Sequence, residues 1–205
     1  MVTKELIIET ATKSFVENGV KSMTIDKIVK ELHTSKRTIY NHFTDKIELL
    51  KACLNEYHSK LKRENEEIIE SSENVIEAMA RLHHRIVQRS YQVNPNFLAD
   101  VKAYYPGVLH ESYRNNGKYA HQQLVFLAQW GINDGIFLKD MDVEVVGKTV
   151  LAMLKLLKNK QTFPIASFSI ERLTFGILVP YLRGMCTPKG LKLLEIQEES
   201  FRVSV

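Results

Sequence analysis

The stretch from Lys36 to Phe43 carries the side chains best suited to chemistry with a polyanion. Only Ile39 and Phe43 lie one helical turn apart and predict a buried face. The outward residues are Lys36, Arg37, Thr38, Tyr40, Asn41 and His42. Arg and Lys pair most often with guanine O6 and N7, and Asn can pair with adenine or contact a phosphate. The pattern predicts a short helix that contacts nucleic acid, although a solvated charged face would look similar.

A second short helix precedes this one and positions it. Its apolar residues recur at helical spacing and are Ile25, Ile28, Val29 and Leu32. His33 and Thr34 interrupt that spacing, and Ser35 is a favourable N-cap for the helix that follows. Two helices joined by a tight turn predict a helix-turn-helix, whose second helix enters the major groove.

The N-terminal region resembles the signature of the tetracycline-repressor (TetR) family. The residues that carry the resemblance are Ile8, Ala11, Phe15, Gly19, Thr24, Ile28, Ser35, Thr38, Ile39, Tyr40, Phe43, Lys46, Leu49 and Leu50. A weaker similarity to some members lies at residues 181–184, with Thr187 and Gly190. The resemblance implies a homodimeric transcription regulator, usually a repressor, that releases its operator when a small ligand binds.

Two positions depart from the family pattern. His33 stands where the turn usually has Gly, so we expect a positive φ at this residue. Arg37 stands where a Gly is common, and it adds a cation that faces the groove. The base preference of other members therefore does not transfer to this chain.

The expected DNA contacts combine the residue types with the resemblance. Lys36 and Arg37 would reach base edges, whereas Thr38, Tyr40 and His42 would contact the backbone. A lysine at the start of the next helix would hold a phosphate together with free backbone N–H groups. The expected DNA-binding residues are Thr24, Ser35, Lys36, Arg37, Thr38, Tyr40, Asn41, His42 and Lys46.

Composition sets limits on the function. The chain has 205 residues and a net charge of +4, so it is not basic throughout. Between Thr24 and Lys46, five Lys or Arg residues stand against three Asp or Glu residues. A modest local excess of positive charge is typical of a site-specific DNA reader.

Helical periodicity runs through the whole chain and strand signals are absent, which predicts an all-α fold. We expect a three-helix DNA-binding domain in residues 1–50 and a helical bundle for ligand binding and dimerisation in residues 51–205. Pro106 and Gly107 are expected to stop one helix, and Pro180 to kink the last one. The expected helices cover residues 3–18, 25–32, 36–43, 45–69, 75–93, 97–105, 119–133, 143–157 and 169–183.

Dimerisation is expected because one recognition helix spans too few base pairs for genomic specificity. The apolar segments 143–157 and 169–183 are the candidate dimer helices, although both could instead be internal core. The family usually pairs two C-terminal helices of each subunit into a four-helix bundle. The expected interface residues are Val146, Gly147, Val150, Leu154, Gly176 and Leu178.

An aromatic and methionine-rich set in the middle of the chain could line an effector pocket. Such a lining suits a small, mostly apolar ligand, although ordinary core is the simpler interpretation of each residue. The set is Met79, His83, Tyr104, Phe126, Trp130, Phe137 and Met153. Nothing in the sequence identifies the ligand.

Other classes of function find little support in the sequence. Cys53 and Cys186 lie outside any metal-ligand spacing, and no catalytic motif is present, so we expect no enzyme, no metal and no cofactor. The charged N-terminus lacks a signal-peptide core and no apolar run is long enough to span a membrane, which favours the cytoplasm. The remaining alternative is a helix-turn-helix fold that binds a protein partner without reading DNA sequence.

Overall fold

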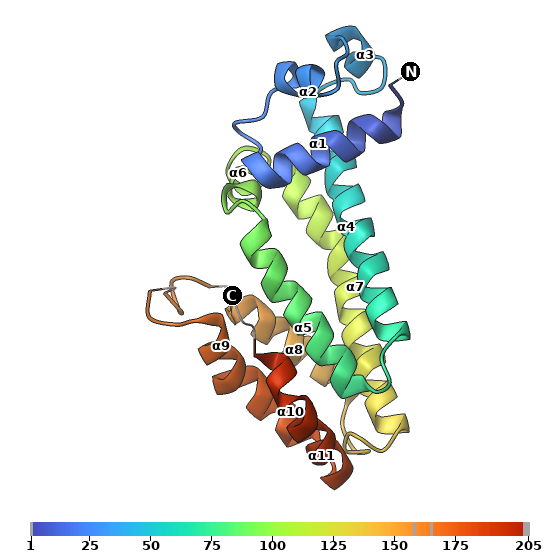
Figure 1. Cartoon of the computed structure of the whole chain (residues 1–205), viewed down its shortest axis with the longest axis vertical. Helices are drawn as coiled ribbons and strands as arrows, with labels where there is room; N and C mark the ends of the chain where they lie inside the picture. The colour runs from blue at the N-terminus through green and yellow to red at the C-terminus, as the bar shows by residue number, and fades with distance from the viewer. Residues whose placement is uncertain (1, 158, 165, 203–205) are drawn as a thin grey trace. The chain divides into compact units, whose positions relative to one another are not determined.

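The computed structural model describes residues 2–157, 159–164 and 166–202, and all regular structure within them is helical (Figure 1). The helices are α1 Lys4–Asn18, α2 Ile25–Glu31, α3 Lys36–Tyr40, α4 Lys46–Glu70, α5 Val75–Gln92, α6 Asn96–Tyr104, α7 Pro106–Asn133, α8 Val143–Leu157, α9 Ile170–Leu173, the π-helix η1 Thr174–Leu178, α10 Val179–Met185, α11 Pro188–Gln197 and the 3-10 helix η2 Glu198–Phe201. The expected all-α class is confirmed. Among the described helices, none is both long and apolar enough to cross a membrane.

Contacts divide the chain into two compact units. Unit 1 contains Met1–Glu64 and Arg89–Asn116, and unit 2 contains Asn65–Gln88 and Gly117–Val205. These units do not coincide with the expected domains of residues 1–50 and 51–205, because α4 continues without a break through residue 50 and α6 packs against α1. The functional division at residue 50 remains a prediction.

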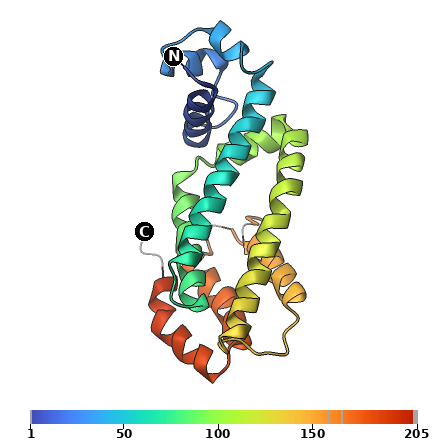
Figure 2. The ribbon, with the colours of Figure 1, turned by 90° about the vertical axis from the view of Figure 1, so that its right-hand side faces the viewer.

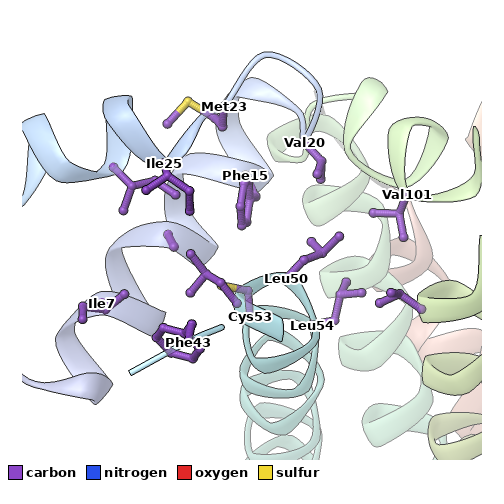
Figure 3. Packing of buried hydrophobic residues seen from close by; sticks show 14 of the residues in the cluster. Ile7, Phe15, Val20, Met23, Ile25, Phe43, Leu50, Cys53, Leu54 and Val101 are labelled. Carbon is purple, nitrogen blue, oxygen red and sulfur yellow. The ribbon is translucent and has the colours of Figure 1, made fainter. Parts of the chain in front are cut away.

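The core of unit 1 joins α1 to α4 and α6. Phe15 of α1 and Leu50 of α4 are fully buried, and Val101 of α6 belongs to the same apolar cluster (Figure 3). The Thr3 side chain caps the first turn of α1, and Gly19 ends the helix with a φ of 80° that favours glycine. The end of α1 is therefore fixed both locally and by residues far along the chain.

The core of unit 2 is built around the turn that follows α7. Phe137 is buried directly against Gly131, where a Cβ atom would lie 2.1 Å from the phenyl ring. The ribbon of α8 lies beside that of α7 (Figure 2). The two helices approach closely, since a Cβ atom at Gly147 would lie 2.9 Å from the Val125 side chain. Both glycines therefore serve close approaches inside this unit.

Two elements differ from the expected ones. α7 begins at Pro106 and not near residue 119, because proline is favourable at the first position of a helix, where no N–H partner is needed. The last expected helix is interrupted by the π-helical segment η1 directly before Pro180. The tail beyond it forms the regular helix α11, which the Thr187 side chain caps.

Candidate nucleic-acid interface

Two side-chain caps and a strained turn define the geometry of the helix-turn-helix. The Thr24 hydroxyl accepts a hydrogen bond from the Lys27 N–H at 3.3 Å, and the Ser35 hydroxyl accepts one from the Thr38 N–H at 3.1 Å. Between the helices, His33 has a φ of 48°, as expected for a residue in place of glycine. Thr24 and Ser35 therefore first serve to start α2 and α3.

Two buried side chains hold α3 in place. Ile39 and Phe43 both lie in the core of unit 1, as the spacing predicted. Helical geometry covers only Lys36–Tyr40, and Asn41 is the C-cap residue. Tyr40 remains 50% exposed, so its ring is free to contact a sugar or a thymine methyl.

The two cations at the start of α3 are in different environments. The Lys36 ammonium lies 2.7 Å from Asp26 Oδ1 in an exposed ion pair, and the hydrogen bond and charge of Asp26 raise the pKa of Lys36. The Arg37 side chain is exposed, and no hydrogen-bond or ion-pair partner for its guanidinium is found in the part of the chain that the structure describes. Arg37 is thus the more available donor for a base edge.

Lys46 lies differently from the expected phosphate contact. Its Nζ donates to the Val20 carbonyl oxygen at 2.6 Å and lies 5.8 Å from the ring centre of Phe15 and 5.9 Å from that of Tyr105. Burial lowers the pKa of Lys46. The ammonium is turned into unit 1 because these long-range partners satisfy it there.

The remaining polar residues of the set lie on the surface of α3 and the turn behind it. The Thr38 and Ser35 hydroxyl oxygens lie 3.0 Å apart, which fixes the Thr38 side chain at the start of the helix. Asn41 is exposed and His42 is half-buried. Arg37, Thr38, Tyr40 and Asn41 together offer donors and one aromatic ring on one short element.

The structure places the predicted effector residues in both units. Tyr104 belongs to unit 1, where its ring lies 5.2 Å from the Lys21 ammonium. Phe126 is 54% exposed beside the half-buried Trp130, whose ring nitrogen donates to Asp134. The effector pocket built from this set stays a prediction.

Other members of that set are held inside unit 2. The Thr174 hydroxyl donates to the Ile170 carbonyl oxygen, so His83 Nε2, 3.0 Å from the same hydroxyl, acts as the donor to it. Burial lowers the pKa of His83 to about 4, which keeps the ring neutral. Phe137 is core, and Met79 and Met153 are half-buried.

One open depression of about 520 Å³ lies after the end of α7. Its lining residues are Ile132, Gly135, Phe137, Leu138, Lys139, Asp140, Met141 and Thr187. Phe137 is the one member of the predicted effector set that borders it. The depression is a surface feature of unit 2 and does not unite the predicted residues.

Most of the expected dimer residues face the inside of their own unit. Gly147 and Val150 of α8 are buried, and Val146 packs on the core of unit 2. Leu154 shares this side of the helix, and Leu178 of η1 is also buried. Gly176 alone of the set is exposed, with open space where its Cβ would be. The other residues therefore pack within their own unit, and the part of the whole set in a dimer interface stays a prediction.

The opposite side of α8 also carries exposed apolar residues, beside the exposed Lys148. Val145 is 56% and Leu156 is 44% exposed, and Ala152 lies between them on the same face. Pro180 and Gly184 continue the line of Gly176 along η1 and α10, and both are exposed. The sequence signal for this surface was the presence of apolar residues on two sides of one helix.

These features define a helix-turn-helix protein, and comparison with known proteins gives its family. Residues 7–53 match the family described as "Bacterial regulatory proteins, tetR family". The match confirms the resemblance found in the sequence: residues 7–53 are similar to the DNA-binding region of the TetR family, and the chain shares the fold of a solved putative TetR-family transcriptional regulator from Rhodococcus.

Individual relatives agree with this assignment. The chain is 34% identical over 100 residues to the uncharacterized HTH-type transcriptional regulator YhgD of Bacillus subtilis, covering 44% of this chain and 52% of that protein. It is 25% identical over 150 residues to the HTH-type transcriptional repressor KstR2 of Mycobacterium tuberculosis, covering 68% of this chain and 72% of the repressor. The match thus spans about half the length of YhgD. These relatives are named as transcription regulators and not as enzymes.

A solved structure shares the fold over most of the chain. A putative transcriptional regulator from Saccharomonospora viridis, crystallised in complex with choline, superposes with a TM-score of 0.69 at 17% identity. The superposition covers 88% of this chain and 96% of that one. At this level of identity the likeness concerns the fold.

Proposed function

We propose that the protein is a homodimeric, ligand-responsive transcription regulator that binds a near-palindromic DNA operator, acting as a repressor. The observation that carries the proposal is the exposed, capped helix α3, which is anchored by Ile39 and Phe43 and presents Arg37 without a competing partner among the described residues. In this arrangement α3 enters the major groove and Arg37 pairs with a guanine.

The other surface residues of the element add affinity, mostly through contacts with the phosphate backbone. Thr38 and Tyr40 contact the phosphate backbone, while Asn41 pairs with a base or a phosphate. Lys36 contributes a weaker electrostatic attraction, since Asp26 already balances its charge. Thr24, Ser35 and His42 lie at the edges of the same surface and complete the predicted contact set.

Dimerisation supplies the second recognition helix. The exposed apolar face of α8 with Val145, Ala152 and Leu156, together with Gly176 and Pro180, supports pairing with a second copy. A symmetric dimer then binds two half-sites about 34–36 Å apart, which is one turn of B-DNA.

Effector control is the third part of the proposal. A small ligand in the part of the chain after the DNA-binding helices would favour a conformation with lower DNA affinity. Relatives lend support: one is named a repressor, and one solved neighbour contains choline. Their ligands and regulated genes are properties of those proteins.

The first experiment is selection of DNA from a pool of random duplexes by the purified protein, at low and at physiological salt. We expect an enriched near-palindrome with half-sites about ten base pairs apart. Retained DNA without an enriched motif, lost as salt rises, would leave only non-specific attraction and would favour the protein-partner alternative.

A further inference from the structure

One peptide group in the turn between α1 and α2 is held between two oppositely charged side chains. The Val20 carbonyl oxygen accepts a hydrogen bond from Lys46 Nζ at 2.6 Å. The Lys21 N–H donates to Asp100 Oδ2, also at 2.6 Å. This carbonyl and this N–H belong to the same peptide bond. A cation from the first turn of α4 and an anion from α6 are therefore joined through the main chain of the turn.

The surroundings make this arrangement strong. The Lys46 side chain is half-buried, and its ammonium lies 5.8 Å from the ring centre of Phe15 and 5.9 Å from that of Tyr105. Burial lowers the pKa of Lys46, and the negative charge of Asp100 opposes this effect. Hydrogen bonds to charged groups are about twice as strong as neutral ones, and removal from water strengthens them further.

Asn94, which lies just before α6, also caps the end of α1. The Asn94 N–H donates to the Val16 carbonyl oxygen at 2.9 Å, and Asn94 Nδ2 donates to the Glu17 carbonyl oxygen at 3.0 Å. These carbonyl groups have no partner inside the helix because they belong to its last turn. The end of α1 and the turn after it are thus both attached by their main chain to residues at and near α6.

We propose that Lys46 and Asp100 are positioning residues for DNA binding, which clamp the Val20–Lys21 peptide between α4 and α6 and thereby set the orientation of α2 and α3. The proposal rests on the DNA-binding function proposed above. It gives Lys46 a role distinct from that of a phosphate ligand. Because α6 carries Asp100, a displacement of α6 would change the orientation of α3 through this clamp.

A double-mutant cycle tests the clamp. The variants are Lys46→Met, Asp100→Ala and the combination, each assayed with the duplex enriched by the wild-type protein over a range of salt concentrations. Each is also assayed with the same half-sites separated by one additional base pair. Lys51→Met is the matched control, because Lys51 also lies on α4 and pairs with an acid, Glu111, at 2.9 Å.

We expect each clamp variant to bind the enriched duplex roughly 10-fold more weakly, and the combination to lose about the same 10-fold, because the two side chains act as a unit. The slope of log affinity against log salt concentration should stay at the wild-type value. Discrimination against the longer spacing should fall in the clamp variants, since their recognition helices are held less firmly. The Lys51→Met protein should keep the wild-type spacing preference.

Three results would overturn the proposal. Losses that multiply to about 100-fold in the combination would show two independent residues. A salt slope reduced by about 0.9 in Lys46→Met would identify a lost phosphate contact. A lower melting temperature with unchanged spacing preference would show a role in stability alone.

Folding failure and failure of the proposed function can both be recognised. If the first variants do not fold, Asp100→Asn and Lys46→Arg replace them in the cycle. Asp100→Asn keeps an oxygen for the Lys21 N–H without the charge, and Lys46→Arg keeps the charge. The same criteria apply to these variants. A wild-type protein that enriches no duplex would refute the DNA-binding function itself. A wild-type protein that enriches one while the variants behave additively would refute only the clamp.

Discussion

At the scale of single residues, neighbouring cations of the recognition helix differ because of their partners. Lys36 and Arg37 are adjacent and exposed, yet among the described residues only Lys36 has an ion-pair partner, Asp26. An exposed ion pair contributes little to stability, typically about 0–1 kcal/mol. It nonetheless reduces the net charge that Lys36 offers to DNA. Arg37 is therefore expected to carry more of the base recognition.

The Arg37→Ala variant should lose about 1–3 kcal/mol of binding to the enriched duplex and relax the base preference at one position of each half-site. The Lys36→Ala variant should weaken binding less, and equally for all sequences. Equilibrium titrations with the enriched duplex and with duplexes substituted at single positions measure both effects. Equal losses in the two variants, with the base preference kept in both, would contradict this assignment.

His83 gives unit 2 a dependence on pH. Its folded pKa of about 4 lies below the ordinary value of 6.5, mainly because of burial. The unfolded chain therefore binds the proton more readily, and stability that is complete above pH 6.5 is lost as the pH falls toward 4. The loss should amount to about 3 kcal/mol in the free energy of unfolding.

Urea unfolding of the wild type and of His83→Gln at a series of pH values measures this contribution. The carboxylates common to both proteins cancel in the comparison. The variant should therefore show a shallower decline between pH 6.5 and pH 4. Parallel declines would mean that His83 becomes protonated in the folded state at its ordinary pH.

At the scale of elements, the turn between α2 and α3 carries backbone strain at a known place. His33 has a φ of 48°, a region that costs a residue with a Cβ atom roughly 1–2 kcal/mol. Glycine removes that cost but has more conformational freedom to lose on folding. The two effects partly offset each other.

We expect His33→Gly to raise the free energy of unfolding by about 0.5 kcal/mol, the part of the strain that remains after the entropy cost. His33→Ala is the matched control, since it removes the imidazole but keeps the Cβ atom. Chemical denaturation of both variants measures the difference. A glycine variant no more stable than the alanine variant would show that the turn is unstrained.

Several elements follow from local sequence, and others depend on distant contacts. The N-cap at Ser35, the buried pair Ile39 and Phe43 and the bounds of α8 agree with the periodicity. Pro106 could be read as a stop or as a first helical residue, and only packing decides between them. The π-helical segment before Pro180 has no comparable local signal.

The candidate site shows the same division. Arg37 and Tyr40 could be placed on the outside of α3 from spacing alone. The inward position of Lys46 could not, because Val20 and Tyr105 reach it only after folding. The proposed outer face of α8 was not among the expected interface residues, because periodicity identifies apolar faces but cannot say which one covers the protein's own core.

At the scale of the whole molecule, the proposed dimer depends on that outer face. The Leu156→Glu variant should dissociate at concentrations where the wild type is paired, because it buries a charge against an apolar surface. An interface anchor of this kind contributes about 2 kcal/mol or more, which corresponds to roughly a 30-fold weaker association. Sedimentation velocity over a dilution series measures the change.

Ile196→Glu is the control for this prediction. Ile196 lies on α11 in the same unit and is 73% exposed, so the same substitution there should leave the association unchanged. If Ile196→Glu dissociates the protein and Leu156→Glu does not, the subunits pair through α11 and the α8 face is not the interface.

The capping of α1 by Asn94 has a consequence for the order in which the chain is synthesised. The first four helices leave the ribosome well before residues 94–108, which complete their core with Phe97, Val101 and Val108. During that interval Phe15, Leu50 and Leu54 lack part of their apolar cover. The last carbonyl groups of α1 also lack the hydrogen bonds that Asn94 donates to them in the folded protein. The DNA-binding helices therefore complete their core only after residues 94–108 have been translated, and until then their exposed apolar side chains favour non-native contacts.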